Sequence, residues 1–207
     1  MKPTLQLYRN AVSGHCHRVE LFLSLLGLPY ESIDVDLARK RHKSLEFLAM
    51  NPLGQIPVLR DGDLTLADSN AMLVYLEGRY APGQWLPRDP VGAARVQRWL
   101  SLAAGPLAFG PAAARVVQLF KLPTDPKDNI ARAEALFALM ETELERAPFL
   151  VGERATLADV AHYAYVARAP EGLVSLQPWP AIRAWLARIE ALPGFVPMLK
   201  SPIGLAA

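Results

Sequence analysis

Residues 51–69 read Asn51-Pro52-Leu53-Gly54-Gln55-Ile56-Pro57-Val58-Leu59-Arg60-Asp61-Gly62-Asp63-Leu64-Thr65-Leu66-Ala67-Asp68-Ser69. Two short apolar runs, 56–59 and 64–66, flank the Asp61-Gly62 pair, and this combination favours a β-hairpin. A proline at the head of a buried strand cannot donate to the sheet, so Pro57 is expected at an edge or at a special X–Pro bond. From the residues alone trans is the expected isomer, because only about 5% of X–Pro bonds are cis.

The residues on both sides of this hairpin predict a small mixed sheet with helices. Apolar and polar residues alternate in a strand over Thr4–Tyr8, and a helix with one apolar face follows from Cys16 to Leu26. The same alternation predicts a second strand over Ile33–Leu37, and a strand–helix–strand unit of this length favours parallel pairing. A short helix is expected over Lys43–Met50, and a longer one from Asp68-Ser69 to about Arg79. The expected order is βαβ-α-ββα.

The second half of the chain predicts helices only. A proline-rich connector over 81–90 separates an expected domain at 1–80 from another at 91–207. Three apolar stripes with helical spacing predict an all-helical bundle: Val96, Trp99, Leu100 and Leu102–Ala103; Ala135, Leu136, Leu139, Met140 and Leu144; Ile182, Trp185, Leu186 and Ile189. The most apolar stretch, Leu102–Ala114, contains two Gly-Pro pairs, and we expect it to be too short and too broken to span a bilayer.

Composition narrows the classes of partner. The 207 residues carry a net charge of +2, which is too small for a nucleic-acid or membrane-surface footprint. A single cysteine excludes an internal disulfide framework and fits a reducing cytoplasm. No apolar segment of a secretory signal precedes Arg9, so the sequence predicts a soluble cytoplasmic protein.

Two helix starts offer sites for a ligand. Ser13 lies before the first helix, where free N–H groups favour negative charge, and its hydroxyl is a candidate N-cap, nucleophile or hydrogen-bond donor. Asp68 and Ser69 together suit a zwitterionic amino-acid end, because Ser69 favours a carboxylate and Asp68 an ammonium group. A cis bond at Ile56–Pro57 would turn the Ile56 N–H and C=O outward, where an extended peptide can pair with them.

Other reactive side chains have structural explanations. Cys16 lies on the apolar stripe of its helix and is expected to be packed rather than reactive. His15 and His17 are expected to be exposed, and with no carboxylate or thiolate nearby to complete a ligand set we expect no metal site. Tyr8 is an alternative hydroxyl donor. Thr156-Leu157-Ala158-Asp159 matches a capping box that starts a helix.

Taken together, these residues resemble the cytosolic glutathione transferase family over essentially the whole chain. The motifs that carry the resemblance are Ser13-x-x-Cys16-x-Arg18-Val19, Asn51-Pro52-x-Gly54-Gln55-Ile56-Pro57-Val58-Leu59, Leu66-Ala67-Asp68-Ser69-x-Ala71 and Gly152-x-x-x-Thr156-Leu157-Ala158-Asp159. The resemblance is to the serine-type, theta- and nu-like bacterial members. It implies a thioredoxin-like N-terminal domain, a helical C-terminal domain, a homodimer and a cis Pro57.

The resemblance also implies roles for particular residues. Glutathione is the expected co-substrate, contacted by His42, Gln55, Ile56, Pro57, Asp68 and Ser69. Ser13 stands where serine-type members donate a hydrogen bond to the glutathione sulfur. Family members more often have Glu where Asp68 stands, so its contact with the ammonium group is expected to be longer or bridged by water.

The expected reaction is attack of the glutathione thiolate on a small hydrophobic electrophile. Candidate residues for the electrophile site are Tyr8, Phe109, Arg115 and Phe120. Two alternatives are a glutathione-dependent disulfide or peroxide reductase and a non-catalytic interaction protein with the same fold. Ser13-Gly14-His15 departs from the Ser-Ser-Cys run of the maleylacetoacetate-isomerase class, which argues against that activity.

Overall fold

The computed structural model describes residues 5–201, so the predicted start of the first strand at Thr4 lies outside the described residues. The first half of the chain has the predicted order of strands and helices. Its elements are β1 (Leu5–Arg9), α1 (Gly14–Leu25), β2 (Tyr30–Asp34), η1 (Arg41–Lys43), α2 (Leu45–Met50), β3 (Val58–Asp61), β4 (Leu64–Ala67) and α3 (Ser69–Tyr80).

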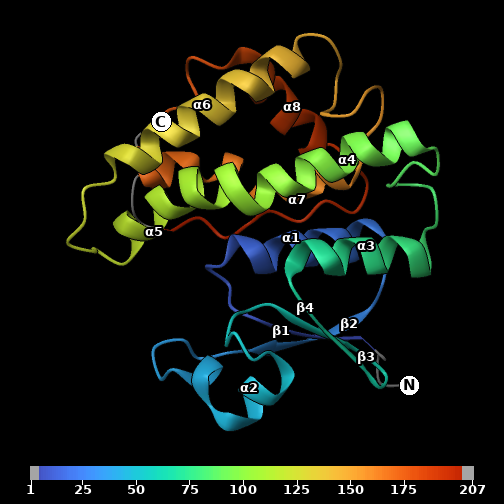
Figure 1. Ribbon diagram of the computed structural model, residues 1–207, viewed down its shortest axis with the longest axis vertical. Helices are drawn as coiled ribbons and strands as arrows, with labels where there is room; N and C mark the ends of the chain where they lie inside the picture. The colour runs from blue at the N-terminus through green and yellow to red at the C-terminus, as the bar shows by residue number, and fades with distance from the viewer. Residues whose placement is uncertain (1–4, 202–207) are drawn as a thin grey trace.

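The four strands form one mixed sheet in the order β2-β1-β3-β4. β1 and β2 are parallel, whereas β3 is antiparallel to both β1 and β4. Figure 1 shows α1 and α3 between this sheet and the helical half of the molecule, with α2 on the opposite side of the sheet. The amino end of α1 and the start of α3 therefore lie next to the helical half.

The second strand begins three residues earlier than the alternation predicted. β2 covers Tyr30–Asp34 and not Ile33–Leu37. Its partner β1 ends at Arg9, which is paired with Asp34, and the last bond runs from the Val35 amide to the Arg9 carbonyl at 2.7 Å. Val35 stays buried in a small apolar cluster after the chain has left the sheet. The alternation reflected burial of these side chains and not backbone pairing.

The second half is helical, as predicted. Its elements are α4 (Pro90–Leu102), η2 (Ala103–Ala112), α5 (Ala113–Leu119), α6 (Lys127–Leu144), α7 (Leu157–Ala167), η3 (Ala169–Gly172) and α8 (Pro180–Glu190). The connector between α3 and α4 coincides with the predicted linker over 81–90, except that Pro90 already belongs to α4. The division of the chain into domains at this connector stays a prediction.

Residues 90–119 form one bent helical run, longer than the apolar stretch Leu102–Ala114. The Gly-Pro pairs bend the run without ending it: Gly110 has the non-helical angles φ −97° and ψ −106°. A Cβ at Gly110 would lie 2.9 Å from the Ala133 amide nitrogen, so the bend lets α6 approach closely. By length and a mean hydropathy of 1.3 the run could cross a membrane, but half of its most apolar part is buried, as in the core helices of soluble proteins.

α7 is the central helix of this half and contacts both α1 and α4. Leu157 to Val166 are all buried, and the capping box predicted at Thr156 and Asp159 starts the helix. The C-terminal segment then returns along α1, where the Ser24 hydroxyl donates to the Gly194 carbonyl at 2.6 Å. The core is therefore continuous from the sheet through α1 to the helices.

Candidate active site

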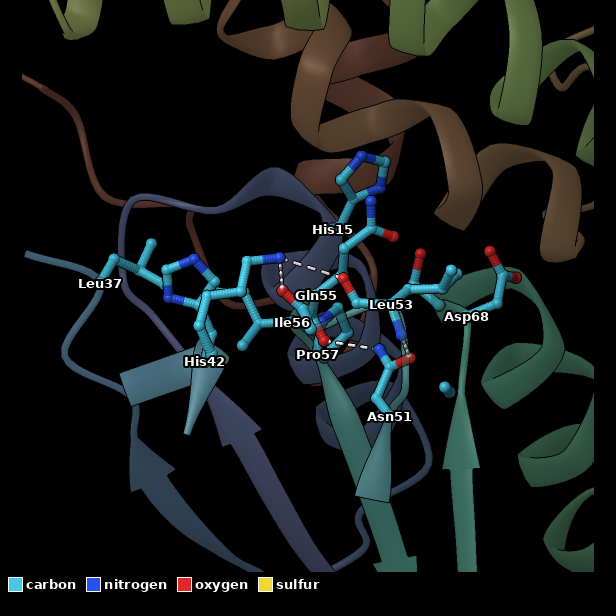
Figure 2. A pocket seen from close by; sticks show the side chains of 13 residues that line it. His15, Leu37, His42, Asn51, Leu53, Gln55, Ile56, Pro57 and Asp68 are labelled. Carbon is cyan, nitrogen blue, oxygen red and sulfur yellow. Dashed lines mark hydrogen bonds between the residues drawn. The ribbon is translucent and has the colours of Figure 1, made fainter. Parts of the chain in front are cut away.

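A cleft of about 610 Å³ lies where the loops after β2 and α2 meet the start of α3. Figure 2 shows its lining side chains converging from these loops and from α1. The lining residues are His15, Leu37, His42, Lys43, Asn51, Leu53, Gly54, Gln55, Ile56, Pro57, Ala67, Asp68 and Ser69. The structure thus brings together all six residues predicted to contact glutathione, namely His42, Gln55, Ile56, Pro57, Asp68 and Ser69.

The loop before β3 is held by two side chains for which the sequence predicted no role, those of Asn51 and Lys43. Asn51 is buried; its Nδ2 donates to the Gln55 carbonyl at 2.7 Å, and its Oδ1 accepts from the Leu53 amide at 3.1 Å (Figure 2). The Lys43 ammonium donates to the Gly54 carbonyl at 2.9 Å. Gly54 has φ +58°, a conformation that favours glycine. The loop is therefore fixed in position ahead of the Ile56–Pro57 bond, which is cis.

The start of α3 presents two oxygens of different character. Asp68 has φ 70°, which few non-glycine residues adopt, and its Oδ1 accepts from the amides of Asn70 and Ala71, both at 2.9 Å. The Ser69 hydroxyl oxygen accepts from the Arg18 guanidinium at 2.8 Å. Because that bond uses a lone pair of the hydroxyl, its proton remains available to a ligand carboxylate. The junction thus combines a carboxylate with a hydroxyl donor.

Arg18 places a buried positive charge behind Ser69. Its side chain is 1% exposed, and the same nitrogen that holds Ser69 also donates to the Asn70 carboxamide oxygen at 2.7 Å. Burial lowers the pKa of Arg18 to about 10, so the guanidinium is still charged at neutral pH. Within residues 5–201 no carboxylate lies within 4.0 Å of it. This charge makes the start of α3 more attractive to an anion.

Ser13 is the N-cap of α1. It has the extended angles φ −86° and ψ 118°, and its Oγ accepts from the Cys16 amide at 3.3 Å. The first turn of α1 contains no acidic residue that would oppose a nearby anion. Capping and donation are compatible, because a hydroxyl that accepts from an amide keeps its own proton. Ser13 does not line the cleft itself, but His15 of the same helix turn does.

Cys16 is fully buried beneath this turn. Burial raises the pKa of its thiol to about 12. A thiol with this pKa is almost entirely protonated at neutral pH, whereas the thiolate is the nucleophilic form. The structure therefore agrees with the packing role predicted for Cys16.

The two histidines of α1 differ from the prediction that both are exposed. His17 is 4% exposed, and its Nε2 lies 2.9 Å from the Val196 carbonyl oxygen of the C-terminal segment. His15 is half-buried, lines the cleft and contacts the Tyr165 ring edge-on at 5.0 Å between centroids. Both positions depend on contacts with the second half of the chain, which the local pattern of α1 does not report.

The four candidates for the electrophile site lie apart from the cleft lining. Tyr8 is half-buried, and its ring meets Phe47 edge-on at 6.4 Å. Phe109 is 58% exposed and lines a separate apolar groove of about 440 Å³ between η2 and α6. Phe120 follows α5 and is also exposed. Arg115 is only 2% exposed and forms an ion pair with Glu171. Its side chain therefore lies in the interior and does not line the cleft.

A mixed four-stranded sheet, a helical second half and a ligand-sized cleft at the start of α3 define a two-part α/β and all-α fold with a binding cleft in its first half. Comparison with known families agrees. The family profile "Glutathione S-transferase, N-terminal domain" matches residues 12–79, and "Glutathione S-transferase, C-terminal domain" matches residues 107–193. The chain belongs to the glutathione S-transferase family.

Individual relatives cover nearly the whole chain. "Glutathione S-transferase theta-2" of Homo sapiens is 35% identical over 200 residues, which are 92% of this chain and 82% of the relative. The crystal structure of a glutathione S-transferase from Pseudomonas fluorescens [Pf-5] has a TM-score of 0.89 at 37% identity, covering 95% of this chain and 100% of that one. A glutathione transferase homolog from Drosophila mojavensis, solved with bound glutathione, has a TM-score of 0.83 at 27% identity, covering 91% and 88%.

Proposed function

We propose that this transferase binds glutathione in the cleft of Figure 2, holds its sulfur as a thiolate beside Ser13 and directs it at small hydrophobic electrophiles. The observation that carries the proposal is that one cleft is lined both by the loop Gln55–Pro57, which can pair with a peptide backbone, and by Asp68-Ser69, which can bind the charged end of an amino acid. A relative of similar fold has glutathione bound. Glutathione has the matching parts: an extended peptide backbone and a zwitterionic γ-glutamyl end.

The γ-glutamyl end fits the start of α3. Its carboxylate would accept from the Ser69 hydroxyl, with the buried Arg18 charge behind it. Its ammonium group would approach the Asp68 carboxylate, whose Oδ1 already holds two amides and whose other oxygen faces the ligand in this proposal. Gln55 and His42 would contact the remaining polar groups of the peptide.

The sulfur would then lie near the amino end of α1. There the Ser13 hydroxyl donates a hydrogen bond that stabilises thiolate over thiol, and the helix dipole acts in the same direction. Each unit by which the pKa of the bound thiol falls below about 8.5 corresponds to about 1.4 kcal/mol and about ten times more thiolate. The thiol proton passes to water. The sulfur lone pair forms the new C–S bond, and the leaving group departs with the bonding pair, or an activated double bond takes up a proton.

The test is Ser13→Ala, with thiolate absorbance of bound glutathione followed against pH and with turnover of an aryl halide. We expect the pKa of the bound thiol to rise by about one unit or more and kcat to fall about 100-fold, as on loss of an oxyanion donor. Ser44→Ala is the matched control. Ser44 caps α2 with the same Oγ to amide distance, 3.3 Å, and has no proposed contact with sulfur. An unchanged thiol pKa in Ser13→Ala, or turnover of disulfides but not of aryl halides, would reject the proposal.

We further propose that the protein is a homodimer in solution. The groove between η2 and α6 is lined almost wholly by apolar residues and leaves Phe109 exposed, as is typical of protein interfaces. Sedimentation at micromolar concentration should give twice the mass of the chain, and Phe109→Asp should shift it towards the monomer. A monomeric wild-type protein would contradict the proposal.

A further inference from the structure

A buried ion pair connects the helical half of the molecule to the turn that holds Ser13. Arg115 of α5 and Glu171 of η3 are 2% and 1% exposed, and Arg115 Nε lies 2.6 Å from Glu171 Oε2. On its other side, Arg115 Nη1 donates to the Val12 carbonyl oxygen at 2.7 Å. Val12 is the residue directly before Ser13, so one guanidinium joins the acidic partner to the turn.

Glu171 is itself fixed by the C-terminal segment. The Ser201 amide donates to Glu171 Oε1 at 3.1 Å, and the Ser201 hydroxyl donates to Oε2 at 2.7 Å. Arg168 lies 3.6 Å from Oε1. Both carboxylate oxygens therefore have partners, and the charge that faces Arg115 has little freedom to move.

The packing of η3 against α5 leaves no room for adjustment at this contact. A Cβ at Gly172 would lie 2.5 Å from the Arg115 amide nitrogen. Glycine at this position lets η3 lie against the backbone of α5, which brings the neighbouring Glu171 opposite Arg115. The position of the ion pair is thus set by backbone contacts and not only by attraction between the charges.

Among the described residues of the first half, the bonds that hold the Ser13 turn run through Asn10 to the segment that follows β2. The Ser13 amide donates to the Asn10 carbonyl at 3.0 Å, and the Val12 amide donates to Asn10 Oδ1 at 3.2 Å. The Asn10 carboxamide donates to the Val35 carbonyl at 3.1 Å. The Arg115 bond ties the Val12 carbonyl to the helices. It therefore restricts the peptide unit that orients Ser13.

We propose that Arg115 is a positioning residue for the Ser13 hydroxyl and that Glu171 holds Arg115 in place. This inference rests on the proposed function, in which Ser13 stabilises the glutathione thiolate. A planar guanidinium can bond the Val12 carbonyl and Glu171 at once, whereas a lysine ammonium on its flexible stem does not reproduce that fork. Without the bond, the hydroxyl stays in the protein but is less well aligned with the bound sulfur.

The variants are Arg115→Lys, which keeps the charge, and Glu171→Gln, which keeps the shape. We expect each to raise the pKa of the bound glutathione thiol and to lower kcat about 10-fold or more, as for other residues that orient a reacting group. Affinity for glutathione should change little, because the cleft lining is untouched. Glu141→Gln is the matched control: it alters a buried carboxylate that accepts from the Ala181 and Ile182 amides of α8, remote from Ser13.

A double variant distinguishes an effect of Arg115 on the position of Ser13 from a general loss of stability. If Arg115 acts through Ser13, Arg115→Lys should cause no further change in thiol pKa in a Ser13→Ala background. Full additivity there, or a wild-type thiol pKa in folded Arg115→Lys and Glu171→Gln, overturns the inference. If Ser13→Ala alone leaves the thiol pKa unchanged, the proposed function itself fails. Should Arg115→Lys not fold, Glu171→Gln gives the same comparison.

Discussion

At the scale of single residues, Tyr165 lies across the first turn of α1, and its ring fills the space that a side chain at position 14 would need. A Cβ built on Gly14 would lie 2.6 Å from the ring. The ring is 6% exposed and has α7 behind it. Gly14 has ordinary helical geometry, so glycine is required here by the close approach of α7 and not by backbone conformation. The turn that contains Ser13 is thereby pressed against the central helix.

Gly14→Ala should lower the free energy of unfolding by about 1–3 kcal/mol, because the Tyr165 ring has to move in a packed region. The matched control is Gly78→Ala in α3, where an added Cβ meets nothing within 4 Å. There alanine should raise the free energy of unfolding by up to about 1 kcal/mol, through its higher helix propensity. Urea unfolding measures both values. Equal stabilisation by the two substitutions would show that the Tyr165 contact does not constrain position 14.

At the scale of elements, the sequence predicted best what is decided locally. The hairpin, the capping box of α7 and the apolar stripes of the second half depend on neighbouring residues, and the structure contains them. β2 was misplaced because Val35 is buried without belonging to a strand. The prediction that His17 is exposed was wrong, because the distant C-terminal segment covers it and the residues around His17 do not show this.

The candidate site divides in the same way. The motifs predicted the residues that line the cleft along 55–57 and 68–69, since each is a local turn or helix start. Arg18 and Arg115 act through partners far away in the sequence, which no local pattern reports. Asn51 bonds residues only two and four positions ahead, but its burial is likewise not visible in the local pattern. Phe109 and Phe120 belong to the helical half and lie apart from the residues that line the cleft, so their place in an electrophile site stays a prediction.

Asp159, at the start of α7, makes more hydrogen bonds than the cap of a surface helix does. Asp159 Oδ2 accepts from the Thr156 amide at 2.8 Å, whereas Oδ1 accepts from the Leu150 amide at 3.0 Å and from the Trp185 indole at 2.8 Å. Asp159 is 1% exposed, so the carboxylate joins α7, the preceding loop and α8 without competition from water. Removing it leaves several buried donors without an acceptor.

Asp159→Ala should therefore lower the free energy of unfolding by about 3 kcal/mol or more, because each buried donor left unpaired costs about 1–3 kcal/mol. Asp89→Ala provides the comparison. Asp89 caps α4 through a single exposed bond to the Gly92 amide at 2.8 Å, and its loss should cost about 1 kcal/mol. Thermal or urea unfolding of both variants tests this order, and similar losses would mean that Asp159 acts only as a helix cap.

At the scale of the whole molecule, three histidines lie in the packing of two helices that contact each other, α1 of the first half and α7 of the second. His15 and His17 of α1 contact Tyr165 and Tyr163 of α7, with ring centroids 5.0 and 5.9 Å apart. His162 of α7 is fully buried against Trp99 at 5.2 Å. Burial lowers the pKa of His15 to about 3, of His17 to about 4 and of His162 to about 3. The packing of α1 on α7, and of α7 on α4, thus includes imidazoles that stay uncharged.

Acid should consequently weaken the fold before most carboxylates titrate. Unfolded histidine has a pKa of about 6.5, so below that pH the unfolded chain binds protons that the folded chain does not. Stability is greatest above about pH 6.5 and falls towards pH 4, by about 1.4 kcal/mol per pH unit for each such histidine.

Urea unfolding between pH 7.5 and 5.5 measures the slope of the free energy of unfolding against pH. His162→Asn should reduce this slope by the contribution of one histidine. His42→Asn, at the cleft, should reduce it less, because His42 is only partly buried whereas His162 is fully buried. A slope unchanged by His162→Asn would show that His162 does not control the response to acid.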